Sequence, residues 1–382
     1  MTTGAQHVVA VRRRKVRRLV ALAALLSLAA PAAAHARDMY ATDNRGNLLR
    51  FDSRFPGVIS DQAAITGLTP GAALVGIDFR PSTGQLVGVG SDSVVYAIDQ
   101  DSGRAQPLGP PFSPGLSGSA FGVEVNPVLD QLRVVSDTGL NARISLVNGA
   151  HVLGSPFPPL NPGTPHVVAI GYGSSSFTLV RPAATTLVAI DSVADQVLLA
   201  DPADAGTLRD GKALGIDVGD PVGLDVAFLP GVGDVAYMVA TPAGSAGANL
   251  YRVSLVTGRA FKFGPVGTGS PFGGRPRLTL TGFAVRQAFA APGLNIPPEV
   301  KILAGNPRPK PGRRALYVAL GTDHDGGVER VQWDTDGDGA FDDATGERLL
   351  RAFPAGTRTL AVRVTDNSGG RATGTLRIAV RR

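Results

Sequence analysis

The sequence predicts an all-β protein, a five-bladed β-propeller followed by a small immunoglobulin-like β-sandwich. The 382 residues include 49 glycines and 29 prolines but few helical patterns, which indicates many short strands joined by turns. A phrase of alternating apolar residues recurs along most of the chain. After about residue 298 the recurrence stops and a regular strand alternation begins.

The recurring phrase opens each repeat. A four-stranded sheet of this size leaves both of its faces uncovered, so sheets arranged radially must shield one another, as in a propeller. Successive openings are 46, 47, 54 and 59 residues apart, and each is followed by short strands and turn residues. The openings are VGIDF at 75–79, FGVEV at 121–125, VAIGY at 168–172, VGLDV at 222–226 and TGFAV at 281–285.

The two ends of the repeat region complement each other. At the end of the region, AFAAPGLNIPP follows TGFAV so closely that three more strands do not fit between them. At its beginning, the chain has the segments DMYATD, NLLRFD and VISDQAAITG, which lack an opening strand. Pairing the two ends gives five blades over residues 38–288, closed by strands from both termini. Six blades stay open as an alternative, because the 54- and 59-residue units have room for another strand pair.

Residues 1–36 have the three-part build of a secretory signal peptide. Six basic residues precede an apolar run over 19–30, and Ala34-His35-Ala36 forms a cleavage site. The alternative is an N-terminal membrane anchor, but the run is short for a bilayer. We therefore expect a secreted, extracellular protein after cleavage near Ala36, with the export route open.

Charge and cysteine content exclude several classes. Removing residues 1–36 takes away six of the 37 basic residues and none of the 31 acidic ones, so the remainder has no net charge and nucleic acid is not expected as a partner. The chain has no cysteine, which excludes disulfides, a thiol nucleophile and a lipoprotein anchor. We expect a monomer with no membrane span.

Three openings carry an acid at the same position. Opening strands line the centre of a propeller, so these carboxylates are a candidate site for a cation or a polar ligand. The alternative is that each acid caps a turn or pairs with an arginine such as Arg133. The acids are Asp78, Glu124 and Asp225, and the other two openings carry Gly171 and Ala284.

The segment LRVVSDTGLNARI concentrates polar residues in one hairpin and is a candidate binding site. Asp-Thr-Gly is a good turn, and the alternative is that its polar side chains satisfy the turn's own backbone. The candidate binding residues are Arg133, Ser136, Asp137, Asn141 and Arg143.

Catalytic motifs are not apparent in the sequence. GLSGS lacks the last glycine of a G-x-S-x-G turn, and the histidines show no paired metal-ligand spacing. We expect a non-enzymatic binding or scaffold protein whose propeller recognises an extracellular glycan or protein. The alternative is an extracellular hydrolase or lyase that uses the central carboxylates.

Two family resemblances follow from these segments. LVGIDFRPSTGQLVGVGSDSVVYAID and FGVEVNPVLDQLRVVSDTGLNARI resemble an exported bacterial domain of unknown function, number 4394, across most of residues 38–288. This resemblance implies a secreted propeller-like domain and no established activity. GGVERVQWDTDGDGAFDDATG and FPAGTRTLAVRVTDNSGG resemble PKD (polycystic kidney disease) domains across 298–382.

The second resemblance fits the domain plan. We expect a propeller over 37–290, a proline-rich linker at 291–297 and a spacer or adhesion sandwich over 298–382, with the single tryptophan in its core.

The sandwich carries an acidic loop that matches half of a calcium loop. Asp-x-Asp-x-Asp-Gly is present, but the twelfth position is Thr345 where a bidentate glutamate is required. We expect weak calcium binding, with an affinity of roughly 0.1 to 1 mM, or alternatively a solvated acidic turn. The candidate ligands are Asp334, Asp336, Asp338 and Asp342.

Overall fold

The computed structural model describes residues 37–152, 165–174, 181–200, 202–205, 207–229, 232–270, 278–287, 295, 297–306, 308–323 and 327–381. The expected signal peptide (1–36) and most of the expected linker (291–294 and 296) lie outside the described residues. The all-β prediction is confirmed, because the elements are strands apart from one 3-10 turn at Ala203–Ala205. Within the described residues, no helix has the length and apolar character needed to cross a membrane.

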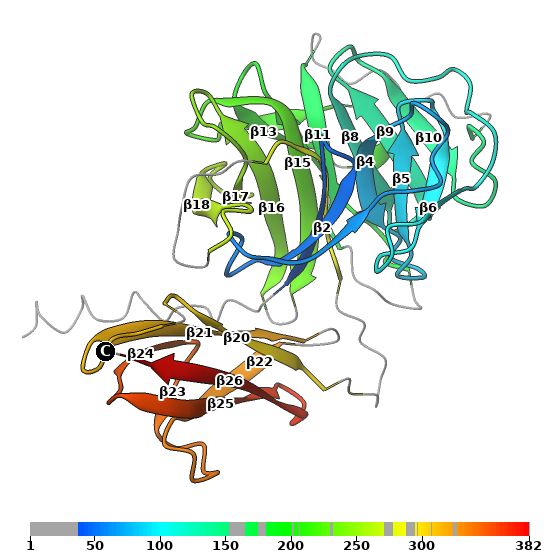
Figure 1. Cartoon of the computed structure of the whole chain (residues 1–382). Helices are drawn as coiled ribbons and strands as arrows, with labels where there is room; N and C mark the ends of the chain where they lie inside the picture. Colours follow the sequence, from blue (N-terminus) through cyan, green and yellow to red (C-terminus); the bar gives the residue numbers. More distant parts are fainter. Residues whose placement is uncertain are drawn as a thin grey trace, which may run out of the picture. The chain divides into compact units, whose positions relative to one another are not determined.

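The described residues from Asp38 to Val285 form five antiparallel sheets (Figure 1). Four of them follow the order of the chain. The first contains β4 (Leu74–Phe79), β5 (Leu86–Gly90), β6 (Val95–Ile98) and β7 (Ala105–Pro107), and the second contains β8 (Phe121–Asn126), β9 (Gln131–Ser136) and β10 (Asn141–Ser145). The third contains β11 (Val167–Tyr172), β12 (Leu187–Asp191), β13 (Gln196–Ala200) and β14 (Arg209–Ala213), and the fourth contains β15 (Val218–Leu229), β16 (Gly233–Pro242), β17 (Asn249–Val253) and β18 (Ala260–Pro265).

The fifth sheet joins the two ends of this region. Its strand order is β19-β1-β2-β3, made of β19 (Leu280–Val285), β1 (Asp38–Asp43), β2 (Asn47–Asp52) and β3 (Ile59–Ala64). Met39 pairs with Val285, and the hydroxyls of Thr42 and Thr281 lie 2.9 Å apart. The pairing of the first and last strands, predicted from the incomplete repeats, is confirmed.

Neighbouring sheets bury each other's apolar faces. Tyr40 of β1 packs in one cluster with Ile77 of β4, and Val87 of β5 packs in the next with Val123 of β8. Three further clusters join the remaining neighbours, the last of them between β15–β17 and the sheet of β1 and β19. Each sheet therefore shares a dry interface with the next one along the chain, which supplies the burial that a lone sheet lacks.

The five strands that open the repeats, β4, β8, β11, β15 and β19, are called the opening strands below. They approach one another closely because small residues occur where they meet. A methyl group on Gly76 of β4 would overlap Val123 of β8, and one on Gly223 of β15 would overlap Phe283 of β19. Glycine at these positions is therefore a packing requirement rather than a turn requirement.

Residues 297–381 form two further sheets around a core of their own. One sheet contains β20 (Glu299–Ala304), β21 (Arg314–Thr322) and β24 (Arg348–Ala352). The other contains β23 (Ala344–Thr345), β22 (Val328–Asp334), β25 (Gly356–Asp366) and β26 (Arg371–Val380). Trp333 is fully buried between them, and its indole N–H donates to the carbonyl of Gly346 over 2.8 Å. The prediction of a tryptophan in this core is confirmed.

A charged cluster connects the first two sheets of the repeat region. Arg80, in the turn after β4, donates through Nε and Nη2 to the two carboxylate oxygens of Asp130 over 2.8 and 2.6 Å. Ser82 and Arg181 also donate to this carboxylate, which is only 8% exposed. Burial alone would raise the pKa of Asp130, but these hydrogen bonds and the arginine charges outweigh it and lower the pKa.

This cluster makes stability depend on acid pH. Because the folded pKa of Asp130 lies below its unfolded value, its contribution is present above the unfolded pKa and is lost as pH falls through the folded pKa. Asp130→Asn keeps a residue type that tolerates the local φ of 56°. We expect it to lower the unfolding free energy by about 2 kcal/mol at neutral pH, with the gap closing below about pH 4.

Urea unfolding of both proteins between acid and neutral pH measures this effect. Asp101→Asn, at an exposed turn position of the same region, is the control and should change little at any pH. A constant gap between Asp130→Asn and the unaltered protein across the whole range would contradict the assignment.

Candidate functional site

The three acids of the opening strands lie together in the interior. Asp78 of β4, Glu124 of β8 and Asp225 of β15 each place a carboxylate oxygen within 4.8 Å of the other two. Their exposed fractions are 4%, 1% and 1%. We predicted that acids at equivalent positions of three repeats lie at one point, and these acids do lie together. They are buried, so a large ligand does not reach them.

Each acid is held by the backbone of the neighbouring opening strand. Val125 N–H of β8 donates to Asp78 Oδ2 over 2.7 Å, and Tyr172 N–H of β11 donates to Glu124 Oε1 over 3.1 Å. Val285 N–H of β19 donates to Asp225 Oδ2 over 2.6 Å. The carboxylates therefore bridge between sheets, in place of the turn caps or arginine pairs considered from the sequence.

Proton affinity in this cluster is strongly altered. Burial raises the pKa of Asp78 well above its usual range, and the negative charge of Asp225 raises it further. Burial likewise raises the pKa of Glu124, with added repulsion from Asp78 and Asp225. Burial raises the pKa of Asp225 to about 6, against backbone hydrogen bonds that lower it. Three negative charges at this point thus require protons or a cation to neutralise them.

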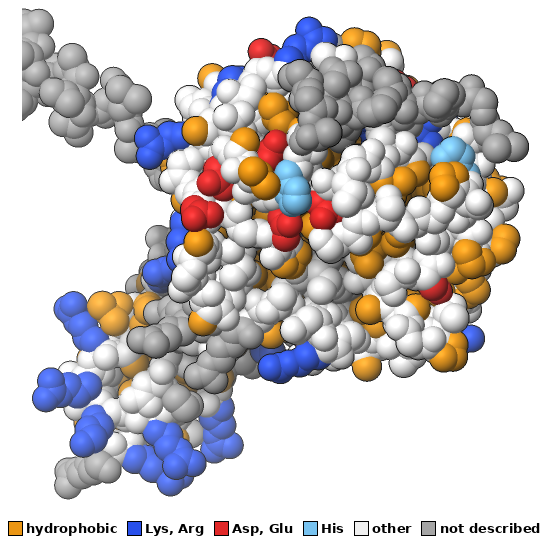
Figure 2. Space-filling model, turned by 90° about the horizontal axis from the view of Figure 1, so that it is seen from above, with side chains coloured by type: hydrophobic (Ala, Val, Ile, Leu, Met, Phe, Trp, Pro, Cys, Tyr) orange, Lys and Arg blue, Asp and Glu red, His pale blue; other side chains and the backbone are white. Residues whose placement is uncertain are grey.

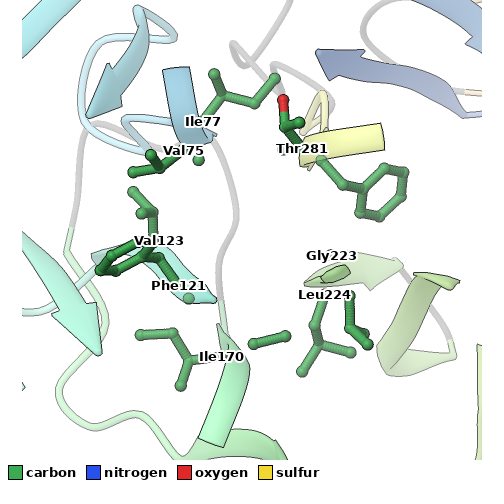
Figure 3. A pocket seen from close by; sticks show the side chains of 14 residues that line it. Val75, Ile77, Phe121, Val123, Ile170, Gly223, Leu224 and Thr281 are labelled. Carbon is green, nitrogen blue, oxygen red and sulfur yellow. The ribbon is translucent and has the colours of Figure 1, made fainter. Parts of the chain in front are cut away.

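A small cavity is lined by all five opening strands, and the three acids are not among its lining residues (Figure 3). Its volume is about 10 Å³, close to the minimum for one water molecule. Ile77, Val123 and Leu224 line it, and each immediately precedes one of the three acids. The space admits a water molecule or a small ion and excludes a sugar ring.

The predicted binding hairpin is largely engaged in its own structure. The Arg133 guanidinium is fully buried and donates to Asn141 Oδ1, the Tyr172 hydroxyl and the carbonyl of Ala203. Ser136, also fully buried, accepts hydrogen bonds from the turn amides of Thr138 and Leu140. These contacts agree with the alternative that the hairpin satisfies its own groups.

Asp137 and Arg143 lie nearer the surface. Asp137 accepts hydrogen bonds from the amide and hydroxyl of Ser119, which lies two residues before the start of β8 at Phe121. These bonds, with the backbone of Ala120 and the charge of His166, outweigh burial and lower the pKa of Asp137. Arg143 lies on β10, partly buried.

A histidine and acidic residues lie near the start of the opening strands. His166 directly precedes β11, and its Nε2 lies 3.0 Å from Oδ2 of Asp220 in β15. Both side chains are about one-third exposed, at 31% and 34%. Figure 2 shows a surface on which histidine and acidic side chains occur together. No local pattern predicted that these two residues would pair, because 54 residues separate them.

The acidic loop of residues 334–343 is only partly as predicted. Asp334, Asp336 and Asp338 lie together, each with a carboxylate oxygen within 4.8 Å of the others. Asp342 is exposed and is not part of this group of described residues. Asp334 accepts hydrogen bonds from the amides of Gly337 and Gly339, so the loop is ordered by its own backbone. Calcium binding here stays a prediction.

Asp343 is the organising residue that the sequence pattern did not identify. Its Oδ2 accepts hydrogen bonds from the amide and hydroxyl of Thr335 and from the amide of Asp336. Arg351 lies 3.4 Å from its other oxygen. The hydrogen bonds from Thr335 lower the pKa of Asp343. The signal for this role was the position of Asp343 just before β23, opposite the end of β22.

The described part of the chain is thus all-β and consists of several separate antiparallel sheets, five of which share buried apolar interfaces. The model of the family described as "Domain of unknown function (DUF4394)" matches residues 47–274, which is more than half of the chain. The chain belongs to this family, and the resemblance inferred from LRVVSDTGLNAR is confirmed. No curated protein matches the sequence.

Solved structures show more distant similarity. The PKD1 domain of Vibrio anguillarum Epp is 21% identical, covering 23% of this chain and 98% of that domain, with a TM-score of 0.20. BamB from Moraxella catarrhalis is 11% identical over 90% of this chain and 86% of its own, with a TM-score of 0.27. Myxococcus xanthus glutaminyl cyclase is 10% identical over 74% and 91%, with a TM-score of 0.30. At these scores, none of the three similarities bears on function.

Proposed function

We propose that this protein is an exported, non-catalytic binding protein. In this proposal residues 1–36 direct export and are removed near Ala36. Residues 37–290 form a five-bladed propeller closed by β1 and β19, residues 291–297 are a linker, and residues 298–382 are an immunoglobulin-like, PKD-like spacer. The ligand is an extracellular glycan or protein bound on the propeller surface.

One observation carries the non-catalytic part of the proposal. The alternative, a hydrolase or lyase, requires a substrate to reach Asp78, Glu124 and Asp225. These side chains are at most 4% exposed, and the adjoining cavity measures about 10 Å³. A glycosidase needs two carboxyl groups on either side of a bound sugar, roughly 5 to 9.5 Å apart. Buried acids whose oxygens lie within 4.8 Å of one another leave no room for a sugar ring between them, which favours a structural role.

The surface near the start of the opening strands is the proposed binding face. Polar groups are placed there by Asp137, His166 and Asp220. A hydrogen bond from Ser119 fixes the position of Asp137, and the hydrogen bond between His166 and Asp220 fixes the other two. Fixed polar side chains on rigid strands lower the ordering cost of binding. This arrangement supports recognition of hydroxyl or amide groups, which both glycans and proteins present.

Binding and turnover are tested together on a panel of cell-wall polysaccharides and secreted proteins. We expect retention on one member of the panel and no release of product. Asp220→Asn combined with His166→Gln should weaken retention about tenfold or more, since it alters one hydrogen-bonded pair of the proposed binding face. Asp61→Asn, at an exposed position of β3, is the matched control. Product release that Glu124→Gln abolishes without unfolding would overturn the proposal.

A further inference from the structure

We propose that Asp78, Glu124 and Asp225 bind one calcium ion where the five opening strands meet. This site is distinct from the acidic loop of residues 334–343, and the proposal does not depend on what the surface binds. Its basis is the donor set, one buried carboxylate oxygen that no N–H group of the described residues reaches, and the charge of the cluster.

The donor set is made of hard oxygen ligands from three strands of three different sheets. Calcium binds six to eight oxygens at about 2.3 to 2.6 Å, so ligands on opposite sides of the ion are about 4.8 Å apart. One oxygen from each acid lies within 4.8 Å of the others. Zinc prefers nitrogen and sulfur ligands, which these side chains do not offer. Magnesium keeps several bound waters, for which a site of three buried carboxylates is less suited.

The orientation of the carboxylates points to an occupant between them. Backbone amides of neighbouring strands hold one oxygen of each acid, as second-shell groups hold the carboxylates of metal sites. Oε2 of Glu124 is buried and accepts no hydrogen bond from an N–H group of the described residues, and the carboxyl group of Glu124 faces that of Asp225. Two buried carboxylates that face each other are costly unless a proton or a cation lies between them. Since the two side chains are each 1% exposed, bulk solvent does not screen the pair.

Charge gives an independent reason. Within the described part of the chain, apart from the contact between Glu124 and Asp225, the hydrogen bonds to these acids come from backbone amides, with no lysine or arginine among the donors. A divalent cation neutralises two of the three negative charges and attracts all three carboxylates. The arginine nearest in the register, Arg133, directs its guanidinium to Asn141, Tyr172 and Ala203 instead.

The two remaining opening strands add no ligand at this level. The positions equivalent to the acids are Gly171 on β11 and Ala284 on β19, with no side chain beyond Cβ. The space beside Gly171 is taken by Val226, since a methyl group there would lie 2.9 Å from Cγ2 of Val226. The three carboxylates are therefore the side-chain ligands that the opening strands offer to an ion at this level.

Bound calcium would cross-link β4, β8 and β15 and so stabilise the arrangement of the sheets. Metal content of the purified protein after dialysis into metal-free buffer tests this directly. Three proteins are compared: the unaltered chain, Glu124→Gln, and the loop variant Asp336→Asn/Asp338→Asn. We expect about one calcium per chain in the unaltered protein and in the loop variant, and none in Glu124→Gln.

Thermal unfolding provides the second measurement. The loop variant is unfolded and then refolded either in chelator or in about 5 mM calcium. We expect its Tm to be higher by about 5 °C or more after refolding in calcium. Calcium kept by Glu124→Gln and lost by the loop variant would place the ion in the loop and overturn the proposal. Absence of calcium from the unaltered protein, with no rise in Tm, would also overturn it. If Glu124→Gln does not fold, the loop variant alone decides: retained calcium supports the site, and none overturns it.

Discussion

Replacing Gly223 by alanine is expected to lower the unfolding free energy of the repeat region by about 3 kcal/mol, at the upper end of typical overpacking costs. The new methyl group would overlap Cβ of Phe283 on β19 and lie 2.9 Å from Cγ2 of Val239. Cβ of Phe283 is fixed to its backbone, so rotation of the side chain does not relieve the clash. The opening strands β15 and β19 would have to separate, which disturbs the shared interior.

Gly219→Ala is the matched control for this change. Gly219 lies on the same strand, and a methyl group there would meet only the carbonyl oxygen of Thr241 at 3.8 Å. We expect its unfolding free energy to stay within about 0.5 kcal/mol of the unaltered protein. Denaturant unfolding followed by circular dichroism compares the two. Equal stability of the two variants would show that β15 and β19 are not packed as closely as described.

Replacing Trp333 by alanine is expected to destabilise the sheets of residues 297–381 by about 3 to 5 kcal/mol. The indole is fully buried among strands of both sheets, and alanine would leave a large cavity there. The substitution also leaves the carbonyl of Gly346 without its indole donor. A unit of this size has limited stability in total, so this loss unfolds a large part of the population at ambient temperature.

Hydrogen exchange read by mass spectrometry localises this effect. We expect β22 and β25 to lose protection in Trp333→Ala while β4 and β8 keep theirs. Trp333→Phe retains most of the apolar volume and should cost clearly less than alanine. Full protection of β22 in Trp333→Ala would contradict the role of the indole as the centre of this core.

Much of the architecture follows from local sequence pattern. The phrases VGIDF and FGVEV became β4 and β8, because alternating apolar residues between turns fit a half-buried strand. The pairing of β1 with β19 followed from a count of missing strands at the two ends. The length of β15, which spans Val218–Leu229, was not predicted, since the strand continues past its opening phrase on both sides.

The position of the candidate site could be predicted from the sequence, but the burial and the hydrogen-bond partners of its side chains could not. Equivalent places in the repeat predicted that Asp78, Glu124 and Asp225 would meet. Their burial was not apparent, because amides from other repeats supply the hydrogen bonds. For the same reason Arg133 looked like a surface ligand residue, whereas Tyr172 and Ala203, far along the chain, enclose it. Long-range partners of this kind leave no mark in a local pattern.

The shared sheet of β1 and β19 also bears on how the chain matures. Met39 can pair with Val285 only after Val285 has been synthesised, so the first strand of this region pairs with β19 only when almost all of the region has been made. Until then β1 and β4 lack one neighbouring strand, and apolar side chains such as Met39 and Phe51 remain exposed and able to associate with other chains. Assembly is therefore a late event of the nascent polypeptide, and its slowest step is the search that brings two distant segments into register.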